Sequence, residues 1–284
     1  MFIEHFPIVL VLFLYQFNIS FSDFTRQSYE VGKLVEEYDP DSDPRLPHEL
    51  GIGHYFQGDI MLEPSQARVS IPDYYSSYSW PNATVPYYIS YRISRESKLR
   101  IQEAINDFEM YTCVRFPSRQ TGEKIFLTFT NEESGCNAYI GRREDNKYNR
   151  VNLQERACFR KSTIVHEIMH SLGFFHEHMR EDRDDYVEIY RNNLRAEYQN
   201  DDFYNSQFGV LPPGQGETYG LEYYYGSVMH YSMYAGSEGR KPVMENKKPW
   251  TGDFGSTYGL TATDAKAINF RYKCNGTYPQ PPPR

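Results

Sequence analysis

The chain has 284 residues, enough for one large domain together with processing segments. Its formal net charge is −8, and this acidity is concentrated at the front: residues 23–68 carry ten Asp or Glu and four Lys or Arg. Residues 69–284 are nearly neutral, with 27 acidic and 26 basic residues. A main domain without a basic excess excludes a nucleic-acid-binding protein that works by gripping phosphates.

The N-terminus is typical of a secretory signal peptide. An apolar run over residues 7–14 has the length of a signal-peptide core, and the small residues Ser20 and Ser22 offer cleavage points. A glutamine and an asparagine interrupt the run before it could cross a bilayer, which argues against stable membrane insertion. We therefore predict a signal peptide over residues 1–22 and a secreted, extracellular protein.

The acidic segment 23–68 is polar and marked by prolines, so we predict an extended propeptide rather than a segment that forms a core. It ends at Arg68, a basic residue at which an activating protease can cut. We predict the main domain over residues 69–274 and a short Pro-rich tail over residues 275–284.

Hydrophobic spacing in the main domain predicts both strands and helices. Three runs are typical of strands: 80–89, 124–130 and 150–154. Ser94 is a candidate cap for a helix over 94–111, and Ser162 or Thr163 for a second helix in mid-chain. The apolar residues of the first helix that repeat at helical spacing are Leu99, Ile101, Ala104, Ile105 and Phe108. Residues 262–272 are predicted as a final helix.

The stretch from His166 to His176 has the spacing of a catalytic zinc site. On a helix His166 and His170 project from one face, and Glu167 can lean over a shared metal without binding it. Gly173 can adopt the left-handed conformation that ends a helix, after which the chain delivers His176 as a third ligand. Three protein ligands leave a position for water, which indicates catalytic rather than structural zinc.

The alternative is a buried helix whose polar side chains are satisfied in the core. The added glycine and third histidine disfavour it, because H-E-x-x-H alone is short enough to arise by chance. For the isolated histidines His5, His48 and His54, a structural role is the better interpretation.

The four cysteines of an exported chain indicate two disulfides. Three connectivities are possible, and the spacing does not choose among them. Free or metal-binding thiols are disfavoured because no C-x-x-C pair is present. Asn82 and Asn275 begin glycosylation sequons, which would lie on the surface if used.

A second motif, Ser227-Val228-Met229-His230-Tyr231, adds a methionine-bearing turn to the histidine motif, and together they resemble the metzincin class of zinc proteases. The longer run from His166 to Asp184 resembles the astacin family in particular. The four cysteines and the segment beginning Trp80-Pro81 fit the same family, so the resemblance covers roughly residues 80–274.

The resemblance implies an α+β fold with two lobes. Its parts are a five-stranded, mostly parallel sheet with two long helices, an irregular C-terminal lobe, and zinc in the cleft between the lobes. It also implies the disulfides Cys113–Cys274 and Cys136–Cys158. Cleavage after Arg68 would make Trp80 the twelfth residue of the mature chain, further in than is usual for the family, so Ser70 and Ile71 are alternative starts.

The resemblance further implies the roles of the site residues. Zn²⁺ would be held by His166, His170 and His176, with Glu167 as the general base. Tyr231 would ligate zinc at rest and then swing away to donate to the developing oxyanion. We expect Met229 to pack as an apolar base beneath the metal, and His178 and His230 to be structural.

Two further residues are assigned by this resemblance. The segment Phe56-Gln57-Gly58-Asp59-Ile60 resembles the latency motif of the family, in which Asp59 would occupy the open position on zinc. The simpler interpretation of Gly-Asp is a turn. Glu177 would contact the new N-terminus of the matured chain, and its alternative is a surface carboxylate.

The sequence thus predicts a secreted zinc metalloendopeptidase, made as a latent precursor, that acts on protein or peptide substrates without nucleic acid. A secreted, non-catalytic zinc-binding or adhesive protein derived from a protease is the alternative, and hydrolysis of a non-peptide amide is another. The presence of both Glu167 and Tyr231 favours the enzyme.

Overall fold

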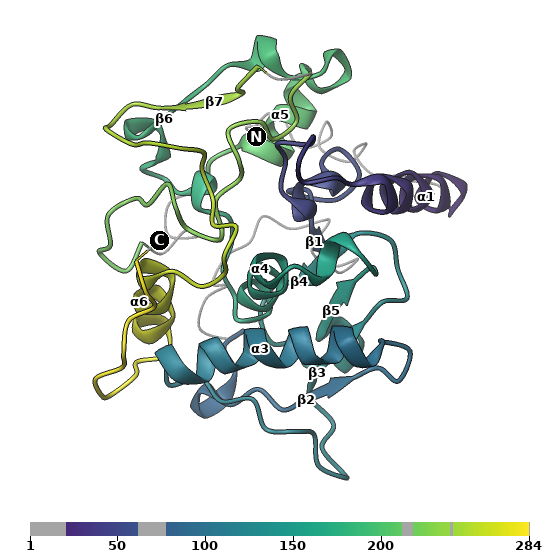
Figure 1. Cartoon of the computed structure of the whole chain (residues 1–284), viewed down its shortest axis with the longest axis vertical. Coiled ribbons are helices and arrows are strands. Elements are labelled where there is room, and N and C mark those ends of the chain that lie inside the picture. The colour runs from purple at the N-terminus through teal and green to yellow at the C-terminus, as the bar shows by residue number, and fades with distance from the viewer. Residues whose placement is uncertain (1–20, 62–77, 212–217, 239–240, 284) are drawn as a thin grey trace, which may run out of the picture.

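The computed structural model describes residues 21–61, 78–211, 218–238 and 241–283, which form two lobes beside helix α4 (Figure 1). Most of the predicted signal peptide and the predicted cleavage point at Arg68 lie outside the described residues. Within the described ranges, every helix is too short or too polar to cross a bilayer.

A five-stranded sheet organises the first lobe, in the order β1-β4-β5-β3-β2. Its strands are β1 (Ile60–Met61), β2 (Tyr87–Ile89), β3 (Leu127–Thr130), β4 (Cys136–Tyr139) and β5 (Arg150–Leu153). All neighbouring pairs are parallel except β4 and β5, which are antiparallel. The predicted five-stranded, mostly parallel sheet is confirmed, but β1 comes from the predicted propeptide and the main domain supplies the other four strands.

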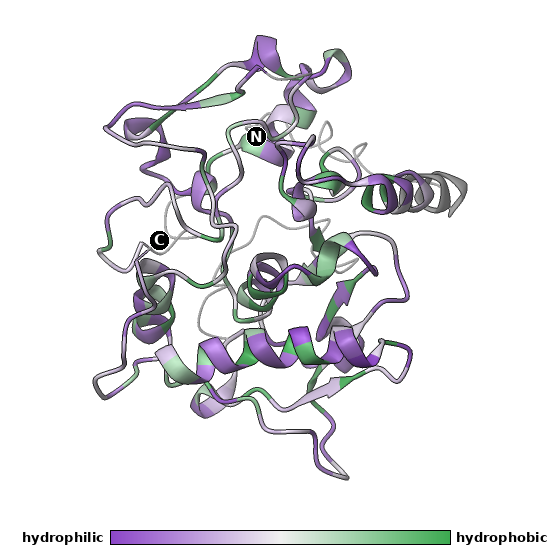
Figure 2. Cartoon of the chain, viewed as in Figure 1, coloured by the Kyte–Doolittle hydropathy of each residue, from purple (hydrophilic) through white to green (hydrophobic). Residues whose placement is uncertain are grey.

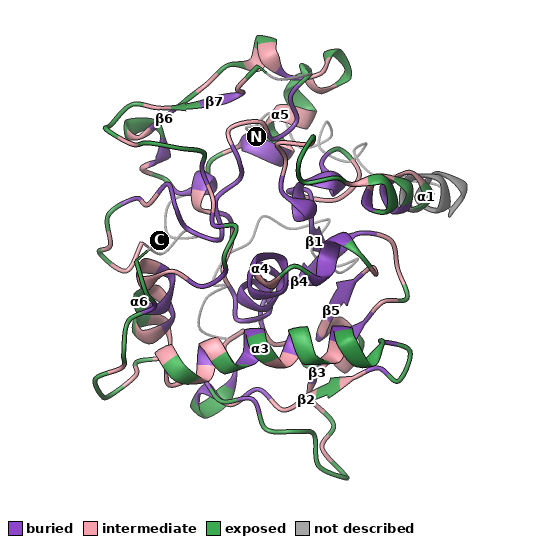
Figure 3. Ribbon diagram, in the orientation of Figure 1, coloured by how far each residue is buried: buried purple, intermediate pink, exposed green. Residues whose placement is uncertain are grey.

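Two helices pack with this sheet around one core. Helix α3 (Arg95–Tyr111) begins at Ser94, whose side chain accepts a hydrogen bond from the Ser97 amide, so that predicted cap is confirmed. Its apolar stripe is buried against α4 (Lys161–Ser171) and the sheet, while its other face is polar and exposed (Figures 2 and 3). Leu99 is 60 % exposed, since it lies two residues before Ile101 and so projects from the opposite side of the helix.

The zinc-motif helix α4 starts without the predicted side-chain cap. Arg160 is the N-cap residue, and its carbonyl accepts from the Ile164 amide at 3.0 Å. Ser162 and Thr163 lie inside the helix and are buried, so that prediction is wrong by two or three residues. At the other end, the indole of Trp80 donates to the Ser171 carbonyl at 2.9 Å and anchors the start of the main domain to α4.

The strand predicted over 80–89 is shorter than expected. Residues Pro81–Ala83 form a 3-10 turn, and only Tyr87–Ile89 pair with β3. The strand over 124–130 likewise begins only at Leu127. The strand over 150–154 ends at Leu153, as predicted to within one residue.

The second lobe is irregular, as predicted. Its regular elements are α5 (Asp201–Phe208), β6 (Val187–Ile189), β7 (Met244–Asn246) and the final helix α6 (Ala262–Arg271). Strands β6 and β7 pair antiparallel, and a second apolar cluster that includes Tyr231 and Phe208 fills this lobe. Both predicted disulfides, Cys113–Cys274 and Cys136–Cys158, are confirmed, and the first ties the end of α3 to the chain after α6.

The predicted propeptide is not merely extended, which corrects the expectation from its composition. It forms helix α1 (Phe21–Glu37) and the 3-10 helix η1 (Pro47–Gly51), and it buries Val31 and Val35 completely or nearly so. The α1 backbone is held to the main domain where Gln154 donates to the Gly32 carbonyl at 2.9 Å. The acidic, polar composition did not predict helix α1, because a few apolar residues on one helix face are enough to stabilise a helix when another domain supplies the rest of the core.

Candidate metal centre and active site

Helix α4 and the turn after it bring three imidazoles together. His166 and His170 are one helical turn apart on α4. Gly173 then adopts φ +98°, its amide donates to the His170 carbonyl at 2.8 Å, and the Phe174 amide donates to the Met169 carbonyl at 3.1 Å. This Schellman motif ends the helix and reverses the chain, as predicted for Gly173, and places His176 beside the other two rings.

The outer nitrogen of each ring is fixed by an oxygen acceptor. The Nδ1 atoms of His166 and His170 lie 2.7 Å from the carbonyls of Val228 and Phe174, respectively. His176 Nδ1 lies 3.1 Å from the side-chain oxygen of Gln57. Because each Nδ1 donates its proton to an oxygen, each Nε2 keeps a lone pair for the centre of the site.

These lone pairs converge with the carboxylate of Asp59. Asp59 oxygens lie 2.9 Å from His166 Nε2 and 3.3 Å from the Nε2 atoms of His170 and His176. His166 Nε2 and His176 Nε2 are only 3.2 Å apart, and all four side chains are fully or almost fully buried. The imidazole lone pairs and the carboxylate oxygens are all electron-pair donors and cannot bond to one another, so the cluster fits a cation. A donor set rich in imidazole fits Zn²⁺.

The electrostatics keep the rings in the form that binds metal. Burial lowers the pKa of His176 to about 4 and also lowers the pKa of His170. Both rings are therefore neutral at physiological pH, and neutral imidazole is the metal ligand.

Glu167 lies beside this cluster without a hydrogen-bond partner. It is completely buried, and within the described part of the chain neither carboxylate oxygen is hydrogen-bonded. Burial, and then the nearby charge of Asp59, raises the pKa of Glu167 well above its usual value. A buried carboxyl held out of any structural bond is the kind of group that accepts and donates protons in catalysis.

The segment of the predicted propeptide that holds Gln57 and Asp59, which we name the prosegment, covers the cluster and also contacts Tyr231. The buried Tyr231 hydroxyl donates to the Gln57 carbonyl, and burial raises the pKa of Tyr231 so that it stays a donor. Gly58 adopts φ +79°, and a Cβ at this position would lie 2.8 Å from the Tyr231 hydroxyl oxygen. Asp59 and Gln57 thus contact the histidine cluster and Tyr231 from the same short segment, which a simple Gly-Asp turn does not explain.

The methionine-bearing turn is held in place by a carboxylate that sequence reasoning missed. Asp264 on α6 accepts from the Ser227 hydroxyl at 2.6 Å and from the Val228 amide at 3.1 Å. The Val228 carbonyl in turn fixes His166, so Asp264 supports a metal-site histidine from a distant helix. Met229 is buried in the core of the first lobe. An Asp three residues after Thr261 predicts a capping box, but nothing in the sequence links it to the turn.

His48 is also part of the site, against the expectation for an isolated histidine. Its ring stacks on His166 with centroids 3.7 Å apart and an interplanar angle of 11°. Among the described residues neither of its ring nitrogens has a hydrogen-bond partner. His178 and His230 are structural, as expected: His178 contacts the Gln207 carbonyl at 3.1 Å, and His230 contacts Tyr223.

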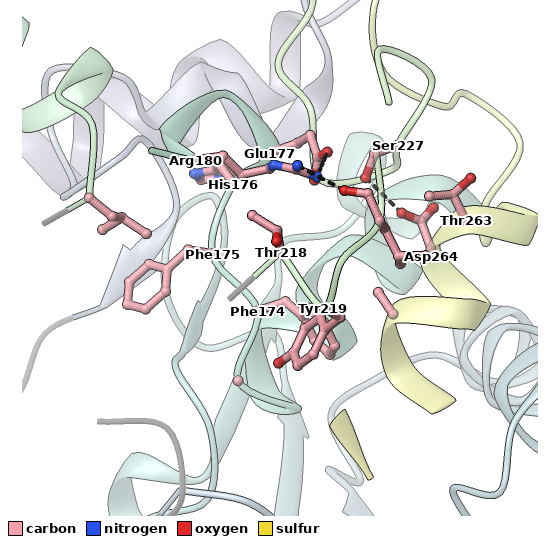
Figure 4. Close-up of a pocket in the computed structure, with 14 residues that line it drawn as sticks. Phe174, Phe175, His176, Glu177, Arg180, Thr218, Tyr219, Ser227, Thr263 and Asp264 are labelled. Carbon is pink, nitrogen blue, oxygen red and sulfur yellow. Dashed lines mark hydrogen bonds and ion pairs between the residues drawn. The ribbon is translucent and has the colours of Figure 1, made fainter. Parts of the chain in front are cut away.

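Glu177 lies on a small cavity next to His176 (Figure 4). The cavity has a volume of about 60 Å³ and is also lined by Arg180, Ser227 and Asp264. Glu177 accepts from Arg180 at 2.9 Å and from the Tyr224 amide at 3.1 Å, and burial raises its pKa to about 7 against the effect of Arg180. It is therefore not the freely solvated carboxylate of the alternative interpretation.

Known zinc metalloproteinases are similar to this chain in sequence. The chain is 33 % identical over 219 residues to zinc metalloproteinase nas-14 of Caenorhabditis elegans, which covers 77 % of this chain and 42 % of that protein. It is 33 % identical over 239 residues to seminal metalloprotease 1 of Drosophila melanogaster, which covers 82 % of this chain and 90 % of the relative. The chain thus spans less than half of one relative and most of the other.

A solved structure agrees with these sequence matches. High choriolytic enzyme 1, a hatching enzyme zinc-protease from the medaka fish Oryzias latipes, superposes with a TM-score of 0.63 at 27 % identity, covering 73 % of this chain and all of that one. The model of the peptidase family described as Astacin matches residues 73–273, the region that holds the three histidines, Glu167 and Tyr231. The chain therefore belongs to the astacin family of zinc metallopeptidases.

Proposed function

We propose that this protein is a secreted zinc endopeptidase that hydrolyses internal peptide bonds of protein or peptide substrates. The observation that carries this proposal is the buried convergence of Asp59 and three imidazoles, with Glu167 unbonded beside them. His166, His170 and His176 would hold the zinc, with Asp59 occupying the fourth position in the precursor. When bound, zinc supplies a Lewis acid and lowers the pKa of a water to about 7.

The residues of the chain then move the protons. Glu167 accepts a proton from the attacking water and passes it to the departing amine. Release of the prosegment removes the charge of Asp59 and admits solvent, and both changes lower the pKa of Glu167 toward that of a working base. The Tyr231 phenol, freed from the Gln57 carbonyl, donates to the developing oxyanion.

The sheet offers a place for the substrate. In the precursor, β1 occupies the outer edge of β4, with Ile60 opposite Ala138 and Met61 opposite Tyr139. Removal of the prosegment frees that edge, and an extended peptide can pair with it through main-chain hydrogen bonds. This positions a scissile bond beside the histidine cluster without a requirement for a particular side chain.

We further propose that the precursor is latent and is activated by proteolysis. The expected order is a signal peptide over 1–22, a propeptide over 23–68, a catalytic domain over 69–274 and a short tail over 275–284. Two disulfides suit an oxidising, extracellular compartment, and the sequon residues Asn82 and Asn275 are both exposed, as glycosylation requires.

Glu177 would receive the new N-terminal ammonium after cleavage. Its cavity is small, is also lined by the buried carboxylate of Asp264, and adjoins His176, so a bound N-terminus would brace the third metal ligand. The partner that Glu177 uses in the precursor is Arg180.

The test is to trim the purified precursor with trypsin and to assay it on a denatured protein, with and without a chelator, while zinc is measured by elemental analysis. The proposal expects one equivalent of zinc and chelator-sensitive cleavage. Bound zinc without cleavage would instead support the non-catalytic, zinc-binding alternative. An Asp59→Ala precursor should be active before trimming, and full latency in that variant would contradict the role of Asp59.

A further inference from the structure

The prosegment makes a second buried polar contact with the main domain, away from the histidines. Glu49 lies in η1 and is 1 % exposed. Its carboxylate accepts from the Ser232 backbone amide, lies 2.8 Å from the Ser232 hydroxyl, and accepts from the Leu46 amide at 3.0 Å. Residues 183 positions apart in the sequence are thereby joined through two hydrogen bonds.

These partners are neutral, so the contact differs in kind from a salt bridge. Burial raises the pKa of Glu49 to about 8, and the carboxyl is therefore largely protonated at neutral pH. A protonated carboxyl can accept from the Ser232 amide and donate to the Ser232 hydroxyl at the same time. The pair is fully satisfied in the docked state, and neither member needs a metal ion or a charged neighbour.

The position of Ser232 gives the contact its consequence. Ser232 directly follows Tyr231, whose hydroxyl is engaged by the Gln57 carbonyl. The prosegment therefore contacts this part of the chain at two points: Gln57 binds the Tyr231 phenol, and Glu49 binds the backbone of Ser232. The neighbouring His48 stacks on His166 from the same short helix, so η1 spans both the tyrosine and the metal-binding helix.

We propose that Glu49 and Ser232 form a metal-independent lock, which sets the register of the prosegment over the cleft and holds the Tyr231 segment in its inactive position. This inference rests on the latency proposed above. A buried polar pair of this kind discriminates against misplaced docking, because a shift by one residue would leave a carboxyl and an amide buried without partners. Asp59 then contacts the histidines only when Glu49 is hydrogen-bonded to Ser232.

Prosegment variants test this cleanly, because trimming removes the altered residue and yields the same mature enzyme. We would compare Glu49→Ala with the wild type and with Asp41→Ala, which removes an exposed carboxylate of the same segment. The first measurement is hydrogen–deuterium exchange of residues 46–61 and of the Ser232 amide in protein freed of metal with a chelator. Loss of the lock should raise exchange at least roughly tenfold in Glu49→Ala and leave Asp41→Ala at the wild-type rate.

The second measurement is cleavage of a short fluorogenic peptide by the untrimmed, zinc-loaded precursors. The untrimmed Glu49→Ala precursor should cleave the peptide roughly ten times faster than the untrimmed wild type, and more slowly than the untrimmed Asp59→Ala precursor. Ser232→Ala removes the hydroxyl from the other side, and its effect on exchange should be smaller than additive with Glu49→Ala. Additive effects, or wild-type exchange in metal-free Glu49→Ala, would overturn the lock. Absence of peptidase activity in every trimmed sample would instead refute the proposed function, while the exchange data would still report on the lock.

Discussion

The backbone at Gly58 offers a quantitative test of how tightly the prosegment fits the site. Gly58→Ala places a methyl group at φ +79°, where an L-residue costs about 1–2 kcal/mol. The new Cβ would also lie 2.8 Å from the Tyr231 hydroxyl oxygen and 3.0 Å from Ile52 Cγ1, both closer than ordinary contact. Together we expect docking to weaken by about 2–3 kcal/mol, which corresponds to a rise of roughly 30- to 150-fold in the population of the open precursor.

The assay is peptide cleavage by the untrimmed precursor, followed by trimming to the common mature enzyme. The activity before trimming should rise by that factor, and the activity after trimming should equal that of the wild type. Gly122→Ala is the matched control, since Gly122 has φ +93° and no atom within 4 Å of an added Cβ. A Gly58→Ala precursor as latent as the control would show that the prosegment relaxes around the methyl group and would refute the reasoning.

Four further predictions concern the proposed chemistry and its control. Glu167→Gln should keep zinc by elemental analysis yet lose nearly all proteolysis, and wild-type turnover would remove Glu167 from the mechanism. Tyr231→Phe should lower kcat by about 10²–10³-fold with zinc retained, whereas an unchanged kcat would assign the oxyanion contact elsewhere. Gly173→Ala should weaken zinc binding in a competition titration, because its Cβ would collide with Arg271 and its φ is +98°, and unaltered affinity would argue against the turn as the positioner of His176. Docking of the prosegment should weaken as the pH rises from about 4.5 to about 8, by up to about 1.4 kcal/mol per pH unit, because the docked Glu49 keeps a proton that the released segment gives up. Glu49→Gln should abolish this part of the pH dependence of docking, measured by hydrogen exchange.

Local chemistry explains what could be predicted from the sequence. The four-residue spacing of His166 and His170 implies a shared helix face, and a glycine at 173 implies the turn to His176, because both follow from backbone geometry within a few residues. The cap at Ser94 is local in the same sense. The disulfide pairing was available only through the family resemblance, since four cysteines allow three pairings.

Two predictions from the sequence were wrong, for different physical reasons. Ser162 and Thr163 are good capping residues, but the helix starts earlier because the chain enters it from the 3-10 turn η5 (Ala157–Phe159). The propeptide composition indicated an extended chain, yet Val31 and Val35 bury against the main domain and stabilise α1. The first error is a shift of a few residues within the local sequence, whereas the second arose because packing against another domain lies outside the local window.

The sequence alone predicts the three histidines proposed to bind zinc, the carboxylate proposed to transfer protons, and the helix that carries all of these except His176, because each depends on residues a few positions apart. The contacts that hold and cover the site are visible only in the folded chain: the Val228 carbonyl on His166, Asp264 behind the turn, His48 stacked on His166, and Glu49 on Ser232. These contacts join residues 36 to 183 positions apart. No periodicity or propensity encodes such pairs, because they form only when the two lobes and the prosegment close around a common core.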